Sequence, residues 1–301
     1  GFVGLAVTMF LFSFLILTIV LNIHKLAGVW FSGRQVVLAN GIVCVGVGMG
    51  AMMGAMISNT VLSPLLGGWK NVLFAYGVLS VIFGFIWCMT RSGPSQEGSD
   101  HNGKDIPFLQ AFLRVIQTKG VWRLALVHLC YMACMTGTTG YLPLYLRNIG
   151  FSPESADGAL AALKGAGMLA AIPLTIISSR FSLKKGMLTV IFLVAMVSVY
   201  SLSVADNILI WPLVVLIGMF HDGYVAIILT MVMETEGIGA VYAGTAIGLV
   251  FSLGSLGSFL SPLAGNAMAG IDPGLPFVFW GSFAIISIIF LYLPAGTRKE
   301  T

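Results

Sequence analysis

The sequence predicts an all-α integral membrane protein, and two observations support this prediction. Hydrophobic residues make up 58% of the 301 residues and charged residues only 9%, whereas a soluble domain carries about 25% charged residues. The apolar residues also gather in nine runs, each close to the roughly 20 residues that a helix needs to cross a bilayer. Too few polar residues remain to coat a soluble globule of this size.

Each run is expected to form a helix, because a helix satisfies all of its backbone polar groups within the segment. A membrane β-barrel would instead show segments of about 10 residues with alternating apolar and polar side chains, and these runs do not alternate. The predicted spans are 4–25, 36–59, 72–90, 121–146, 154–178, 186–204, 208–233, 239–267 and 276–294.

The basic residues predict the orientation of these spans. Of the fifteen Lys and Arg residues, twelve fall in or beside every second gap, two (Lys70 and Arg147) fall in the other gaps, and Lys164 lies within a span. Cytoplasmic loops carry the excess of positive charge in membrane proteins. We therefore expect the N-terminus outside, the C-terminus inside, and a multi-pass protein of the plasma or inner membrane.

The longest polar stretch, 91–120, has two parts. Residues 92–106 are rich in Gly, Ser and Asp, a composition typical of a flexible linker. From Pro107 to Gln117 apolar residues recur at helical spacing, with Arg114 on the opposite side. This second part predicts an amphipathic helix on the inner membrane surface.

Four short segments carry a resemblance to a known family. Residues 30–34 (Trp-Phe-Ser-Gly-Arg) are followed by 39–42 (Ala-Asn-Gly-Ile), then by 68–74 (Gly-Trp-Lys-Asn-Val-Leu-Phe), and later by Arg180 with a Lys pair in 179–185. In order and spacing these motifs resemble the major facilitator superfamily. The first two are similar to its turn between helices four and five, the third to the start of helix six, and the last to the basic turn after helix eight.

The resemblance implies helices four to twelve of a twelve-helix bundle, with the first three helices absent from this chain. The expected parts are a partial N-terminal half (1–90), a cytoplasmic linker with the amphipathic helix (91–120) and a six-span C-terminal half (121–301). It also implies two halves that rock about a central cavity, with cytoplasmic motif residues that help to gate it. Those motif residues are Arg34, Arg180, Lys184 and Lys185.

Ionisable residues within the spans are the first candidates for a substrate site, because burying a charge in the membrane is costly. Lys164 lies about 15 Å into its span and His221 with Asp222 about 20 Å into theirs, at 1.5 Å per residue. Lys164 would attract an anion, and Asp222 or His221 would carry a coupling proton. A structural Lys164–Asp222 pair is the alternative.

Hydroxyl groups in the span 121–146 supply further candidates for contacts with a polar substrate. The substrate-binding set is completed by Tyr131, Thr138 and Tyr141. The same hydroxyls could instead form hydrogen bonds between helices, and the residues alone leave both interpretations open.

These observations predict a secondary transporter that moves a small organic anion with protons by alternating access. Two alternatives stay open: an efflux pump for amphipathic compounds, suggested by 15 Met and 20 Phe residues, and an inactive fragment of a transporter. Neither His-Glu-x-x-His nor paired catalytic aspartates occur in the spans, so we expect no enzyme. We expect no metal, cofactor or nucleic acid, and a monomer in the bilayer whose partners are the solute and protons.

Overall fold

The computed structural model describes residues 34–89, 107–181 and 184–293, together with residues 4, 7, 8 and 11. The predicted first span, 4–25, is therefore almost entirely outside the described residues. The same is true of the motif residues 30–33 and of the Gly/Ser/Asp-rich linker 92–106.

Every regular element in the described ranges is a helix, and the chain is an all-α protein. The helix predicted between Pro107 and Gln117 is confirmed as α5. In chain order the elements are α2 (Arg34–Ile57), the π-helical turn η1 (Ser58–Leu62), α3 (Ser63–Leu66), α4 (Trp69–Met89), α5 (Phe108–Ile116), α6 (Lys119–Asn148), α7 (Pro153–Phe181), α8 (Lys184–Leu202), α9 (Asn207–Met233), α10 (Gly239–Met268) and α11 (Leu275–Tyr292).

Six stretches of the described chain are long and apolar enough to cross a membrane: Val45–Leu66, Trp69–Met89, Lys184–Leu202, Asn207–Met233, Tyr242–Met268 and Leu275–Tyr292. Helices α6 and α7 are also long enough, at 30 and 29 residues. Helix α6 is more polar than the six, yet most of its side chains are buried against other helices. A helix enclosed by protein needs less apolar surface toward lipid, so α6 fits the interior of a bundle.

A π-helical turn interrupts the helix that begins with α2. Pro64 follows η1 (Ser58–Leu62) by two residues, and a proline cannot donate the backbone hydrogen bond that would continue an α-helical ladder. The wider turn takes up this mismatch and rotates the side chains that follow. The helix then ends at the glycine pair Gly67 and Gly68, whose φ angles of 76° and 129° lie in the region that favours glycine.

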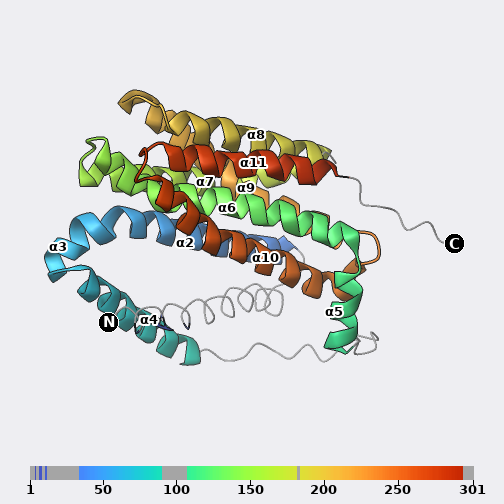
Figure 1. The fold of residues 1–301 in the computed structure, drawn as a ribbon. Helices are drawn as coiled ribbons and strands as arrows, with labels where there is room; N and C mark the ends of the chain where they lie inside the picture. The colour runs from blue at the N-terminus through green and yellow to red at the C-terminus, as the bar shows by residue number, and fades with distance from the viewer. Residues whose placement is uncertain are drawn as a thin grey trace. The chain divides into compact units, whose positions relative to one another are not determined.

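The contacts divide the chain into two units, residues 1–47 with 66–102 and residues 48–65 with 103–301. In the second unit α6 packs against α10 and α11, α7 against α9, and α8 against α9 and α11 (Figure 1). The predicted division at 1–90, 91–120 and 121–301 stays a prediction, as does the orientation in the membrane.

Trp280 of α11 anchors one end of the second unit. Its indole is fully buried and lies against Gly137 of α6 and Gly265 of α10, where a Cβ would collide with the ring. The indole N–H donates to the carbonyl oxygen of Ser261 at 3.2 Å. Small residues at such contacts allow helices to approach closely in lipid, so the glycines here fix how α6, α10 and α11 pack.

Candidate functional site

The candidate site lies where α6, α7 and α9 meet in the second unit. These helices bring together aromatic, basic and acidic side chains near the middle of their lengths. We name this group the central polar cluster, and its members are His128 and Tyr131 of α6, Lys164 of α7, and His221, Asp222 and Tyr224 of α9.

Two glycines set the position of Asp222. A Cβ on Gly167 of α7 would collide with the Asp222 carboxylate and with the carbonyl oxygen of Gly218, and a Cβ on Gly218 of α9 would collide with the backbone of Leu163. The backbones of α7 and α9 therefore cross in close contact at this level. The crossing turns the Asp222 side chain toward α7.

Lys164 lies on the same face of α7 as Gly167, because residues three apart are neighbours on a helix surface. The Lys164 ammonium is close enough to act electrostatically on both Asp222 and His221. The two ion pairs in the described part of the chain are elsewhere, so Lys164 and Asp222 do not form a direct pair. The half-buried ammonium group is thus left without a bonded counter-charge.

Aromatic rings enclose the other side of the cluster. The Tyr131 ring centroid lies 4.2 Å from that of Tyr224 and 5.8 Å from that of His221. Nδ1 of His128 lies 2.9 Å from the Tyr224 hydroxyl oxygen, and the two rings are stacked. Nδ1 of His221 is buried and has no hydrogen-bond partner among the described residues.

Sequence reasoning did not select His128 and Tyr224 for this cluster. His128 lies at membrane depth in α6, so its depth alone was a usable signal. Tyr224 follows His221 by three residues and shares its helix face. The described residues contain no group of three His, Cys, Asp or Glu side chains that could hold a metal ion.

The other predicted hydroxyls lie further along α6 and engage other helices. Thr138 is buried two turns beyond Tyr131. The Tyr141 hydroxyl donates to the carbonyl oxygen of Pro273 at 3.3 Å, and its ring packs against Trp280. Nearby, Thr136 donates to Ser258 of α10 at 2.9 Å. The structure therefore brings Tyr131 to the central polar cluster and places Tyr141 in contacts between helices.

Three of the four predicted cytoplasmic motif residues, Arg180, Lys184 and Lys185, lie at the junction of α7 and α8. Lys184 begins α8 and forms an ion pair with Glu234 at the end of α9, while Lys185 is exposed. Arg34 begins α2 and Arg180 lies in the last turn of α7, and the side chains of both are outside what the structure describes.

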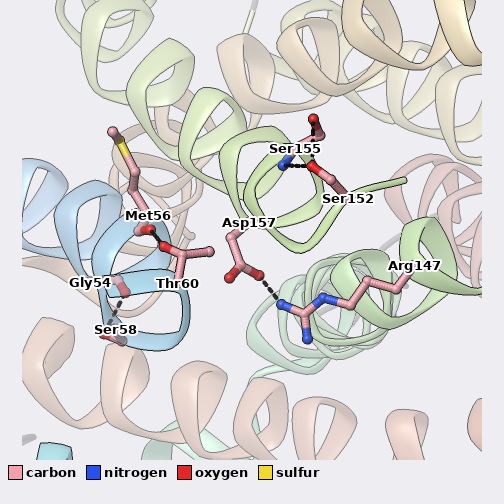
Figure 2. A network of polar contacts seen from close by, with 8 residues as sticks. All are labelled: Gly54, Met56, Ser58, Thr60, Arg147, Ser152, Ser155 and Asp157. Carbon is pink, nitrogen blue, oxygen red and sulfur yellow. Dashed lines mark hydrogen bonds and ion pairs between the residues drawn. The ribbon is translucent and has the colours of Figure 1, made fainter. Parts of the chain in front are cut away.

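A second charged network lies at the junction of α6 and α7. Figure 2 shows Arg147 of α6 forming an ion pair with Asp157 of α7. With its amide oxygen turned toward the guanidinium, Asn59 of η1 accepts hydrogen bonds from Arg147 at 2.7 and 3.1 Å, the orientation that matches acceptor to donor. Sequence reasoning treated Arg147 as an ordinary loop charge and missed this network.

The family follows from a direct match to the sequence. A profile described as Major Facilitator Superfamily matches residues 1–262. The chain belongs to this superfamily. The fold agrees: a solved crystal structure titled as a bacterial homolog to the human lysosomal transporter Spinster, inward-facing and unoccupied, aligns with a TM-score of 0.68.

That alignment has 17% sequence identity and covers 90% of this chain and 73% of the other. At this identity it establishes the shared fold of the superfamily and leaves the substrate open. No curated protein matches the sequence. As a superfamily member, the chain is a multi-pass membrane protein of the secondary transporter class.

Proposed function

We propose that this protein moves a small organic anion across the membrane together with protons, by alternating access, with Lys164 as the contact for the anion. The observation that supports this proposal is the half-buried Lys164 ammonium, which forms no ion pair in the described part of the chain. A cation at membrane depth is costly unless a partner compensates its charge. A carboxylate on the cargo would supply that partner.

Asp222 is the proposed carrier of the coupled proton. Its carboxylate faces the same α7 surface as Lys164 and interacts with it electrostatically. When Asp222 is ionised it competes with an anionic cargo for the Lys164 charge. Protonation of Asp222 removes that competition, so binding of the anion and binding of the proton favour each other.

The remaining members of the proposed site have positioning roles. Tyr131 and His221 form one wall beside Asp222, and the His128–Tyr224 contact holds Tyr224 against Tyr131. Thr138 and Tyr141 stay candidates for contact with a longer cargo further along α6.

Close helix contacts support alternating access. Within the second unit, Met168 of α7 lies against Gly48 and Met52 lies against Gly165 of α7. Glycine faces packed by flexible methionines allow one helix to slide on another with little steric cost. In the superfamily such helices belong to different halves. Sliding of these helices on one another is the movement that the proposal requires.

The proposal is tested by uptake measurements with Lys164→Ala in cells that express the protein from its own gene. Loss of a charge-assisted contact costs about 1.5–3 kcal/mol, so uptake affinity for the transported carboxylate should fall roughly 10- to 150-fold. Lys164→Arg should keep part of the uptake, and Lys70→Ala, which removes an exposed cation outside the central polar cluster, should keep all of it.

A panel of carboxylates with and without an imposed pH gradient gives the second readout. The proposal requires that the gradient increases uptake and that Asp222→Asn removes this increase. Unchanged uptake in Lys164→Ala would reject Lys164 as the anion contact. Export of amphipathic dyes without carboxylate uptake would favour the efflux alternative.

A further inference from the structure

The junction between α5 and α6, residues 107–123, has two apolar sides and one basic side; we name it the α5–α6 elbow. One side of α5 is buried against α6 and α10 through Ala111 and Val115. An adjacent side exposes Leu109 and Leu113, which are 66% and 45% exposed and one turn apart. This pair is too apolar for an ordinary solvated helix face.

The direction of α5 places this exposed side at a membrane surface. Figure 1 shows α5 crossing the end of α6 steeply instead of continuing along it. If α6 crosses the bilayer, as the fold of the superfamily requires, α5 lies along the bilayer surface. An amphipathic helix in that position buries its apolar side at the boundary between headgroups and acyl chains.

Hydrogen bonds hold the elbow in one shape. The indole N–H of Trp122 donates to the carbonyl oxygen of Ile116 at 2.8 Å, and the Thr118 hydroxyl donates to the carbonyl oxygen of Arg114 at 3.0 Å. These bonds satisfy carbonyl groups at the end of α5 that have no partner within the helix. Trp122 itself is exposed, and tryptophan is enriched at membrane interfaces.

The elbow itself contains no acidic residue. Arg114 and Lys119 are exposed, Arg123 is half-buried, and no Asp or Glu occurs between residues 107 and 153. The Arg123 Nη1 donates to the carbonyl oxygen of Leu293 at 3.2 Å, and its buried Nε has no partner among the described residues.

The connection between α9 and α10 passes beside Arg114. The Arg114 guanidinium lies beside Gly237. Glu236, the residue before Gly237, forms no ion pair in the described chain, and Glu234 is paired with Lys184. Among the described residues, no ion pair therefore neutralises the positive charge of the elbow.

We propose that the α5–α6 elbow binds an anionic phospholipid. Leu109 and Leu113 contact the acyl chains, and Arg114 with Lys119 contacts the headgroup phosphate. The charge of the site favours an anionic headgroup, because each Lys or Arg near an anionic membrane surface strengthens binding about fivefold. The occupant is a lipid and not a soluble anion, because the apolar pair adjoins the cations. The inference is independent of the transported solute.

Lipid retention by the purified full chain in detergent tests the proposal. Phosphatidylglycerol and phosphatidylcholine are titrated separately, and bound lipid is counted by native mass spectrometry. The intact chain should retain phosphatidylglycerol more strongly. In Arg114→Gln with Lys119→Gln, phosphatidylglycerol affinity should fall about 25-fold, while phosphatidylcholine binding stays the same. In Leu109→Ser with Leu113→Ser, retention of both lipids should fall.

Lys185→Gln is the matched control, because it removes an exposed cation outside the elbow. It should leave the retention of both lipids unchanged. Equal phosphatidylglycerol affinity in the double Gln variant and the intact chain would overturn the proposal. An equal loss in the Lys185 control would also overturn it, because the charge effect would then be non-specific. Displacement of the lipid by millimolar inorganic phosphate would show a free-phosphate site instead and would overturn it too.

Discussion

The second unit carries one ion pair at each of two helix junctions, and the two pairs differ in burial. At the α6–α7 junction the side chains of Arg147 and Asp157 are 32% and 6% exposed. Where α8 begins, the side chains of Lys184 and Glu234 are 24% and 58% exposed. Water and salt screen the second pair far more than the first.

The partners of the two pairs differ as well. Arg147 also binds Asn59, so its guanidinium joins the π-helical turn η1 to α6 and α7. Lys184 and Glu234 join only the start of α8 to the end of α9. The α6–α7 junction is therefore held by more polar contacts than the junction at the start of α8. Under the proposed alternating access, this inequality makes the α6–α7 junction the harder one to open.

Asp157→Ala should have the largest effect among the changes that test this comparison. It leaves the Arg147 guanidinium partly buried without a counter-charge, and breaking such a pair costs about 3 kcal/mol of unfolding free energy. The midpoint of thermal unfolding in detergent gives the measurement. The double variant Arg147→Ala with Asp157→Ala should recover part of the loss, because neither charge is then left alone.

A small effect of Asp157→Ala would contradict the expected influence of burial on the strength of these pairs. If this variant and Glu234→Ala lower the unfolding midpoint equally, the difference in exposure does not decide the strength of these pairs.

The helical fold was predictable from the sequence because apolar run length is a local property. The predicted spans 72–90, 208–233 and 276–294 agree closely with α4 (Trp69–Met89), α9 (Asn207–Met233) and α11 (Leu275–Tyr292). The π-helical turn was not predicted in that form. A proline within an apolar run favours a break or kink, but the geometry that absorbs a missing hydrogen bond depends on how the neighbouring helices pack.

The candidate site was predictable only in part. Depth in an apolar span selected Lys164 and Asp222, because charge burial is costly wherever it occurs. The contact of Asp222 with Gly167 depends on how α7 crosses α9, which no local pattern encodes. Asp157 carried no distinctive signal in the sequence, because acidic residues are common near the start of a helix.

Asn59→Ala should have an intermediate effect. Asn59 is exposed, but it accepts two hydrogen bonds from a charged donor. Removing it should cost about 1 kcal/mol, again measured by thermal unfolding in detergent. Because Asn59 and Asp157 share Arg147, their effects should not add. Strict additivity in the double variant would show that Asn59 does not act through Arg147.

Pro64→Ala tests the origin of the contact between Asn59 and Arg147. Alanine at this position restores the backbone donor that an α-helical ladder needs. The π-helical turn should then relax and rotate Asn59 away from Arg147, so that Asn59→Ala added to Pro64→Ala has no further effect on the unfolding midpoint. A further loss equal to that in the intact chain would mean that the turn forms without the proline.

Glu234→Gln should have the smallest effect. The carboxylate is mostly in water, where an ion pair contributes about 0–1 kcal/mol. The change keeps the size of the side chain and removes only its charge, so the unfolding midpoint should hardly move. Any change in the unfolding midpoint that Glu234→Gln causes should vanish when the salt concentration rises from about 0.01 to 1 M, because the screening length falls from about 30 to 3 Å. The loss in Asp157→Ala should persist in the same buffers, because protein and not solvent surrounds that carboxylate. A salt-sensitive loss in Asp157→Ala together with a salt-resistant loss in Glu234→Gln would reverse the ranking of the two junctions.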